Sequence, residues 1–229
     1  MLKKRELSVL VVLAMVFAMV FFACGDSGSE VEYGPSVDGV SYKIGDTGQG
    51  GGIVFYVSQQ GFNVEGYGKA YYLEIAPEGW DGDGDAEAVY QWAPSGSGAY
   101  DAVAGTSLEI GTGRKNTAII LAAAGGDRSV TAPAANACAI YSTDKTNPGD
   151  WFLPSLNEIA QLRIFHIAVE NGEYPGLNII DFGLVYSASY WSSSQGVEDN
   201  SAWVQYFYEE SQFGKEKGDP YYVRAIHAF

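Results

Sequence analysis

The segment Asp150-Trp151-Phe152-Leu153-Pro154-Ser155-Leu156-Asn157-Glu158 contains the clearest helix start in the chain. Ser155 and Glu158 form a capping box, in which the hydroxyl and the carboxylate each satisfy an otherwise unpaired backbone N–H. Apolar residues lie on one side of the expected helix, at positions 159, 162, 165, 167 and 169. The pattern therefore predicts a helix that begins after Ser155 and ends near Gly172.

Weaker patterns flank this helix on both sides. Two Ala-rich segments, 117–124 and 134–141, favour short helices separated by Gly125-Gly126-Asp127. Strands are predicted at 51–57, 70–76, 190–194, 202–208 and 221–229, with a turn-like segment between the first two. Helices in the middle and strands at both ends predict an α+β fold.

The N-terminus carries the three parts of a secretory signal in order. Lys3, Lys4 and Arg5 precede an apolar run of 17 residues, 7–23, and small and polar residues take over at Gly25. A membrane-spanning helix is the alternative, but it needs ~20 apolar residues. We expect residues 1–23 to be a cleaved signal peptide.

Phe21-Phe22-Ala23-Cys24 resembles a bacterial lipobox, in which the cysteine is acylated and becomes the new N-terminus. The resemblance implies lipidation of Cys24. One acyl chain anchors a protein only marginally, so the three chains of a mature lipoprotein would give a stable anchor. The lipid bilayer is thus an expected partner, and the expected location is the bacterial cell envelope, at the outer membrane or cell surface rather than the inner membrane.

Residues 24–39 are rich in Gly, Ser, Asp and Glu, which predicts a flexible tether because such a composition does not offset the entropy of ordering. Packed sequence begins near Val40, and we expect residues 40–229 to form a single domain. With Cys24 lipidated, Cys138 has no partner for an intramolecular disulfide. Cys138 is interpreted as a small core residue.

The chain has a formal net charge of -15 at pH 7. Removal of Lys3, Lys4, Arg5 and Glu6 takes the charge to -17, because three positive charges and one negative charge leave. Such a surface repels nucleic acid and sulfated polymers unless its few cations cluster. The adjacent residues Arg114 and Lys115 are a place where such a cluster would form.

Six segments of the chain together form a recognisable series. They are Gly45-Asp46-Thr47-Gly48 running into Gly51–Tyr56, Ile110–Gly113 with Asn116-Thr117, Asp150–Ser155 with Glu158, Tyr190–Ser194, Ala202-Trp203, and Val223–Ile226 leading to Phe229. In this order they resemble the Lcl-type C-terminal domain family, named for bacterial collagen-like adhesins. The resemblance covers the chain from about Gly45 to Phe229.

The resemblance implies a C-type-lectin-like fold, distantly related to the formylglycine-generating enzymes, with short helices, small antiparallel sheets and long loops. In the named member of the family the domain serves adhesion and binds sulfated glycosaminoglycans. This chain has no collagen-like repeat and is strongly acidic, so we do not expect that ligand class to carry over.

Catalytic patterns are sparse, and we expect no enzymatic activity. The two histidines are His166, in the capped helix, and His227, in the last strand, and each is interpreted as a packed or surface residue. No G-x-S-x-G elbow occurs. The copper chemistry of formylglycine-generating relatives needs two cysteines, whereas the expected domain has Cys138 alone. The glycines at 48–52 precede a strand and predict a turn rather than a phosphate loop.

One pattern is typical of a metal site. Asp81, Asp83 and Asp85 alternate with glycine, and alternate carboxylates in such a loop can converge on Ca²⁺. An EF-hand would need Gly and Glu where the chain has Ala86 and Trp92. A solvated acidic loop is the alternative, and calcium is the only cofactor that the sequence suggests.

The aromatic residues divide into two groups. Trp151, Trp191 and Trp203 lie inside the segments of the family resemblance and are expected in the core. Trp80 and Trp92 flank the acidic loop, where their polar neighbours favour partial exposure and a ligand role beside Asp81, Asp83 and Asp85. The alternative, which is commoner for such residues, is that each Trp holds the long loop onto the core. Glu198 and Asn200 form a second, weaker candidate in a turn that resembles the calcium-ligating residues of C-type lectins.

The sequence supports three hypotheses of function. The favoured one is a membrane-anchored lipoprotein whose lectin-like domain binds a carbohydrate or protein ligand through its loops. The alternatives are an enzyme of unrecognised type that uses Asp and Glu with His166 or His227, and a purely structural envelope protein. The sequence identifies neither the ligand nor the oligomeric state.

Overall fold

Strands from both ends of the domain pair in one four-stranded sheet. The computed structural model describes residues 32–82, 88–178 and 182–229. Strands β1 (Ile53–Val64) and β2 (Gly68–Ile75) form an antiparallel hairpin. Strand β9 (Ile226–Ala228) pairs with β2, and β4 (Trp151–Phe152) pairs with β9, which gives the order β1-β2-β9-β4.

The second sheet has five strands in the order β3-β8-β5-β6-β7. They are β3 (Val89–Gln91), β8 (Pro220–Tyr222), β5 (Ser189–Gln195), β6 (Ser201–Tyr206) and β7 (Ser211–Glu216). All neighbours are antiparallel except β5 and β8. The single strand expected at 221–229 is therefore wrong: it is two strands, β8 and β9, that belong to different sheets.

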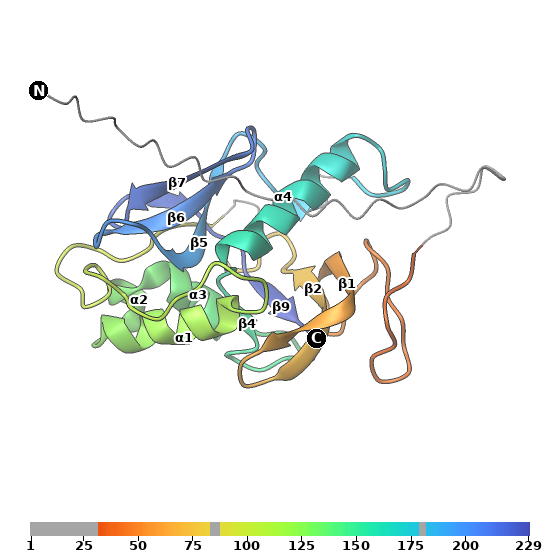
Figure 1. The fold of residues 1–229 in the computed structure, drawn as a ribbon, viewed down its shortest axis with the longest axis horizontal. Coiled ribbons are helices and arrows are strands. Elements are labelled where there is room, and N and C mark those ends of the chain that lie inside the picture. The colour runs from red at the N-terminus through yellow and green to blue at the C-terminus, as the bar shows by residue number, and fades with distance from the viewer. Residues whose placement is uncertain (1–31, 83–87, 179–181) are drawn as a thin grey trace, which may run out of the picture. The chain divides into compact units, whose positions relative to one another are not determined.

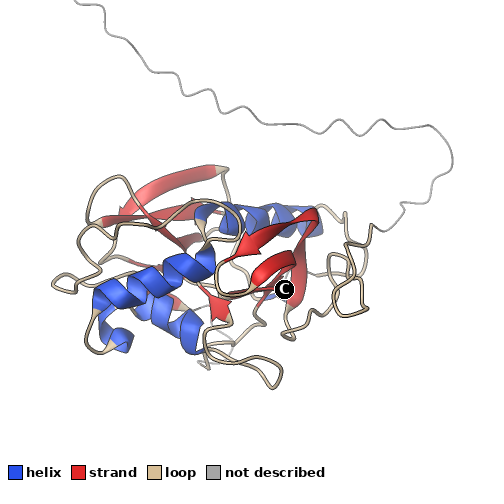
Figure 2. Ribbon diagram, turned by 60° about the horizontal axis from the view of Figure 1, so that its bottom comes forward, coloured by secondary structure: helices blue, strands red, loops and turns tan. Residues whose placement is uncertain are grey.

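The four described helices lie between β3 and β5 in the sequence, and β4 lies between α3 and α4. Helices α1 (Gly113–Ala124), α2 (Arg128–Thr131) and α3 (Pro133–Ile140) pack together next to β4 (Figures 1 and 2). Helix α4 (Leu156–Glu170) contacts β1 of the first sheet and β5 and β6 of the second. The α+β class is confirmed. None of the helices in the described part of the chain is long and apolar enough to span a membrane.

The predicted start of α4 is confirmed in detail. The Ser155 hydroxyl accepts from the Glu158 N–H at 3.4 Å, and Glu158 Oε2 accepts from the Ser155 N–H at 2.6 Å. Ile159 and Leu162 are fully buried beneath this start. Burial of each such side chain contributes ~1.5–3 kcal/mol, so the apolar face of α4 fixes the helix against both sheets.

The core has two main parts. One contains Trp92, Trp151 and Trp191 with the inner sides of α1 and α3, and Cys138 is buried there, as expected. The other surrounds α4 and includes Phe207. Trp203 is only partly buried at the margin of this second part, so its expected place inside the core is wrong.

Three boundaries differ from the sequence prediction. The compact unit begins at Glu32, so the last eight residues of the expected tether belong to it, and the Gly34 N–H donates to the Tyr42 carbonyl at 2.8 Å. The segment expected to be turn-like between the first two strands is mostly strand, because β1 continues to Val64. In addition, helix α2 and strands β3, β4 and β7 were not predicted at all.

Candidate ligand-binding site

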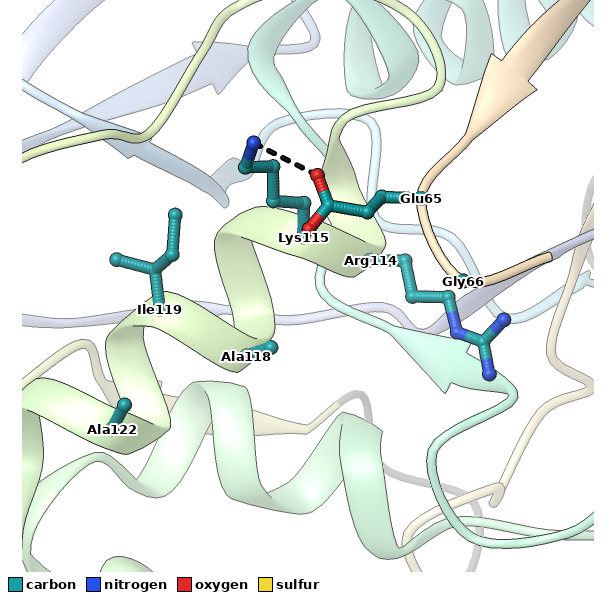
Figure 3. A pocket seen from close by; sticks show the side chains of 7 residues that line it. All are labelled: Glu65, Gly66, Arg114, Lys115, Ala118, Ile119 and Ala122. Carbon is teal, nitrogen blue, oxygen red and sulfur yellow. Dashed lines mark ion pairs between the residues drawn. The ribbon is translucent and has the colours of Figure 1, made fainter. Parts of the chain in front are cut away.

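A shallow, open surface hollow with a volume of about 430 Å³, called the cavity below, lies between the tip of the β1–β2 hairpin and one side of α1 (Figure 3). Small-molecule sites occupy ~300–1,000 Å³, so the cavity has the size of a site for a small ligand. Residues that line it are Glu65, Gly66, Arg114, Lys115, Ala118, Ile119 and Ala122.

Helix α1 supplies an apolar floor to the cavity. Ala118, Ile119 and Ala122 are three, four and seven residues after Lys115, a spacing that places them on one face of the helix. The two alanines are exposed and Ile119 is partly buried. Small side chains keep this face shallow and open to a ligand.

The two cations of the cavity point to opposite sides of the first turn of α1 (Figure 3). Lys115 Nζ lies 2.8 Å from Oε2 of Glu65, a residue in the turn of the β1–β2 hairpin. The Arg114 guanidinium reaches Asp150 Oδ1 at 3.5 Å and donates through Nε to the Gly149 carbonyl at 3.1 Å. Each cation is therefore paired with a carboxylate, and the basic cluster considered at Arg114 and Lys115 is locally neutralised.

A tyrosine stands next to the cavity. Tyr67 follows the lining residue Gly66 in the hairpin turn and is 46% exposed. Partial burial raises the pKa of its phenol, Asp38 and Asp150 raise it further, and Arg114 lowers it. The phenol thus lies in the field of the same ion pair that borders the cavity, and it stays a neutral hydroxyl donor at physiological pH.

The turn that leads into α1 is held in place by Glu158, the capping residue of α4. Glu158 is fully buried, and its Oε1 accepts from the Gly111 N–H at 2.7 Å. Gly111 has a φ of +91°, and a Cβ there would lie 2.2 Å from the Asn63 carbonyl oxygen. One carboxylate therefore fixes the turn that leads into α1, and the missing side chain at Gly111 lets the hairpin pack against that turn.

Burial of Glu158 has an electrostatic consequence. Removal from water raises the pKa of its carboxyl to about 7, although backbone N–H groups of Ser155, Gly111 and Gly113 oppose the shift. A Cβ at Gly113 would lie 2.3 Å from Glu158 Oε2, so this position also requires the absence of a side chain. Glu158 is thus a positioning residue for the site and lies beneath it.

The expected exposure of Trp80 and Trp92 is wrong. Trp92 is completely buried and Trp80 is 7% exposed. The Trp92 indole N–H donates to the Ser192 carbonyl at 2.8 Å, and the Trp80 ring packs edge-on against Tyr141 at 5.6 Å between centroids. Both indoles pack into the core, so neither offers an open face on which a sugar would stack.

The acidic loop lies only partly within the described chain. Asp81 is described, and its Oδ2 accepts from the Tyr90 hydroxyl at 3.1 Å. Asp83 and Asp85 lie outside the described residues, as does Glu87. Among the described residues, no three His, Cys, Asp or Glu side chains are grouped so that they would hold a metal ion.

The second candidate turn is organised by a lysine. Glu198 and Asn200 are exposed, and between them the Asp199 carbonyl accepts from Lys217 Nζ at 3.0 Å. The same ammonium donates to the carbonyls of Ala99 at 3.0 Å and Asp101 at 2.6 Å. The turn is therefore tied to the 99–101 loop by a buried ammonium group.

Both histidines are buried, so the interpretation of each as a packed residue is confirmed and the alternative of a surface residue is wrong. His166 is 1% exposed and stacks on Tyr186. His227 is 9% exposed, and its Nδ1 lies 2.7 Å from Glu74 Oε1. Glu74 also accepts from the N–H groups of Gly50 and Gly52 at 2.6 and 2.7 Å, so this pair stabilises the glycine turn that the sequence predicted.

The cavity combines residues that the sequence did not bring together. Glu65 and Lys115 are 50 positions apart, and no pattern in either segment predicts their ion pair. The sequence feature nearest to the cavity was the Ile110–Gly113 segment, which contains the turn before α1. That segment indicated a fold and not a binding site. Cys24, the expected lipidation site, lies outside the described residues.

Comparisons with known proteins add no assignment. No protein-family profile matches the chain, and no curated protein shows significant similarity to it.

Proposed function

We propose that the protein is a lipoprotein of the bacterial cell envelope, anchored through acylated Cys24, and that its domain binds a carbohydrate. The binding site is the cavity between the β1–β2 hairpin and α1, which is the observation that carries the proposal. The order of charged, apolar and small residues before Cys24 supports the anchor.

The chemistry of the cavity favours a sugar over a polyanion. Ala118, Ile119 and Ala122 offer an apolar surface to the C–H face of a sugar ring. Lys115 and Glu65 supply a donor and an acceptor for hydroxyl groups. Exposed ion pairs contribute ~0–1 kcal/mol, so a hydroxyl-rich ligand can share or replace them at little cost. A sulfated chain would have to displace carboxylates from both cations.

A C-type-lectin-like fold of the Lcl type is part of the same proposal. Support comes from the six sequence segments, three of which are joined by hydrogen bonds around the start of α1. Glu158 accepts from the Gly111 N–H at 2.7 Å, and Asn116 Nδ2 donates to Ser193 Oγ at 3.2 Å. The α+β architecture with two small sheets agrees with this fold class.

An enzyme remains the second hypothesis, with His166 or His227 as the base. Neither histidine lies at the cavity, and both are at most 9% exposed. Binding is therefore the function that the described geometry supports best.

The test is a glycan-array screen of residues 25–229, followed by titration with the best glycan. Ala118→Trp fills the floor of the cavity, and the matched control is Ala123→Trp, which adds the same side chain at an exposed position of α1 outside the lining. We expect Ala118→Trp to weaken binding by at least about tenfold, or ~1.4 kcal/mol, and Ala123→Trp to have no effect.

Circular dichroism and thermal melting of both variants show whether the fold is kept. The proposal fails if the parent binds no glycan, or if the two tryptophan variants bind equally well. Binding to a protein ligand that competes for the same cavity would retain the site and change the ligand class.

A further inference from the structure

Three tyrosines form a second exposed feature, which shares no residue with the cavity lining. The tyrosine cluster consists of Tyr186, Tyr206 and Tyr208. The rings of Tyr186 and Tyr208 have centroids 5.3 Å apart at 71°, and those of Tyr206 and Tyr208 are 6.2 Å apart at 49°. The cluster joins the turn before β5 to the turn after β6.

Two of these tyrosines lie on either side of a buried residue at the end of β6. Tyr206 ends β6 and Tyr208 follows two residues later, whereas Phe207 between them is completely buried. Phe207 is held by its N–H, which donates to the Ala188 carbonyl at 3.0 Å. Tyr208 is 56% exposed, and Tyr186 and Tyr206 are partly exposed. The chain thus anchors one aromatic residue in the core and displays its two neighbours.

The ring of Tyr186 packs against buried residues. Tyr186 stacks on the buried His166 with centroids 5.4 Å apart and planes at 15°. His166 packs edge-on against Phe207 at 5.7 Å. Because of the contact with His166, the Tyr186 ring is ordered before any ligand arrives, which lowers the entropic cost of binding to that ring.

The charges around the cluster are mainly acidic. Glu209 and Glu210 follow Tyr208 directly and are exposed, and Glu170 lies 3.5 Å from the His166 ring at the edge of α4. Arg163 is the nearby cation, and its Nε donates to the Phe207 carbonyl at 3.0 Å. Carboxylates accept hydrogen bonds from sugar hydroxyls and repel sulfate and uronate groups.

We propose that the tyrosine cluster binds a polysaccharide chain of neutral sugar units by stacking on their C–H faces. Aromatic rings of tyrosine offer a large apolar area with little side-chain entropy to lose, and each ring carries a hydroxyl at its rim. The proposal rests on carbohydrate binding as the function and adds a second contact region, which would raise the affinity for a polymer over that for a single sugar.

The test is native affinity electrophoresis of residues 25–229 in gels that contain hydroxyethyl cellulose, galactomannan or dextran. The Tyr206→Ala, Tyr208→Ala double variant removes two rings, and Tyr206→Phe, Tyr208→Phe keeps them. Tyr33→Ala is the matched control, because Tyr33 is 53% exposed and lies outside the cluster. We expect retardation of the parent by at least one polymer, an affinity loss of about tenfold in the alanine pair, and parental behaviour of the other two variants.

The outcomes separate this proposal from the cavity. Retardation that Ala118→Trp abolishes and the alanine pair leaves intact would overturn the tyrosine cluster and retain the cavity. The same holds if short glycans bind but none of the three polymers retards the parent. Absence of binding to glycans of any length would overturn both proposals.

Discussion

Trp92 makes three kinds of interaction: its ring packs in the core, its indole N–H donates a hydrogen bond, and its ring face contacts an ammonium group. Its ring is buried, its indole N–H bonds to the Ser192 carbonyl, and Lys217 Nζ lies 4.6 Å from its centroid. The polar sequence around it led us to expect exposure. The ring is instead part of the core, where the ammonium group of Lys217, 125 positions later, lies over it, and no local pattern predicts that contact.

We expect Trp92→Ala to lower the free energy of unfolding by ~3–5 kcal/mol, as the loss of a buried aromatic side chain does. Urea denaturation of residues 25–229 measures the change. Tyr33→Ala is the control and should stay within ~0.5 kcal/mol of the parent, since exposed substitutions have small effects. A Trp92 variant as stable as the control would contradict the core position of this ring.

Burial of His166 makes the free energy of unfolding depend on pH. Burial lowers the pKa of its imidazole, Glu170 raises it and Arg163 lowers it. Because the folded-state pKa lies below the ordinary value, the unfolded chain binds the proton first as pH falls through about 6.5. Stability contributed by neutral His166 is therefore present above that pH and is lost below it.

The corresponding variant is His166→Phe, which keeps a ring against Tyr186 and Phe207. We expect the parent to lose more stability than this variant when the pH falls from 7 to 5, as measured by urea denaturation at each pH. Equal losses in parent and variant would show that the pKa of His166 is the same in the folded and unfolded states, and would contradict the prediction.

At the scale of elements, the sequence predicted best where a local rule decides the structure. The capping box fixed the start of α4, and Gly125-Gly126-Asp127 separated α1 from the next helical segment. Prediction failed where strand pairing decides the structure. Polar side chains outnumber apolar ones in β7, which includes Lys215 and Glu216, yet it is a strand because β6 pairs with it along its whole length. Likewise, β8 and β9 separate because Arg224 between them is buried and donates to the Ala76 carbonyl.

The capping box also has a pH signature. Burial raises the Glu158 pKa to about 7 from an ordinary value of 4.5. Between these values the folded state binds the proton that the unfolded chain releases, so the contribution to stability is full below pH 4.5 and is lost as pH rises through 7. The largest possible change is ~3 kcal/mol, from 1.36 kcal/mol per pH unit.

Glu158→Gln removes this titration while it keeps an amide of similar shape. We expect the stability advantage of the parent over the variant to shrink as the pH rises from 5 to 8 in parallel urea titrations. An advantage that grows with pH would mean that Glu158 is stabilised as the anion by its three backbone N–H partners.

At the scale of the whole molecule, the sequence predicted the class of the fold but not the location of the cavity. The α+β arrangement follows from the order of the local patterns, whereas the cavity needs the hairpin tip to meet α1 across Gly111. Such a meeting depends on long-range packing. The Trp80–Trp92 region attracted the prediction instead because it combines the residue types of binding sites.

The anchor is tested by Cys24→Ser. We expect this variant to incorporate no labelled palmitate and to accumulate as unprocessed precursor, because acylation and cleavage both require the cysteine. Metabolic labelling with subsequent electrophoresis reports both results. Undiminished incorporation would overturn the lipoprotein proposal.

Charge predicts weak binding to heparin. The net charge of the full sequence is -15, and the two cations at the cavity are already paired with Glu65 and Asp150. We expect elution of residues 25–229 from a heparin column well below physiological salt. Retention beyond that salt concentration would place an unrecognised basic surface on the domain.

The buried ammonium of Lys217 gives the loops around it a counter-ion that is part of the chain. Burial lowers its pKa to about 8, with Asp101 and Asp199 acting to raise it, so the group is mostly charged at neutral pH. Three carbonyl groups converge on it, an arrangement that elsewhere serves dissolved cations. A counter-ion that is covalently attached cannot be diluted, exchanged or chelated. The 99–101 and 198–200 loops should therefore keep their conformation in environments where the supply of dissolved ions varies from moment to moment.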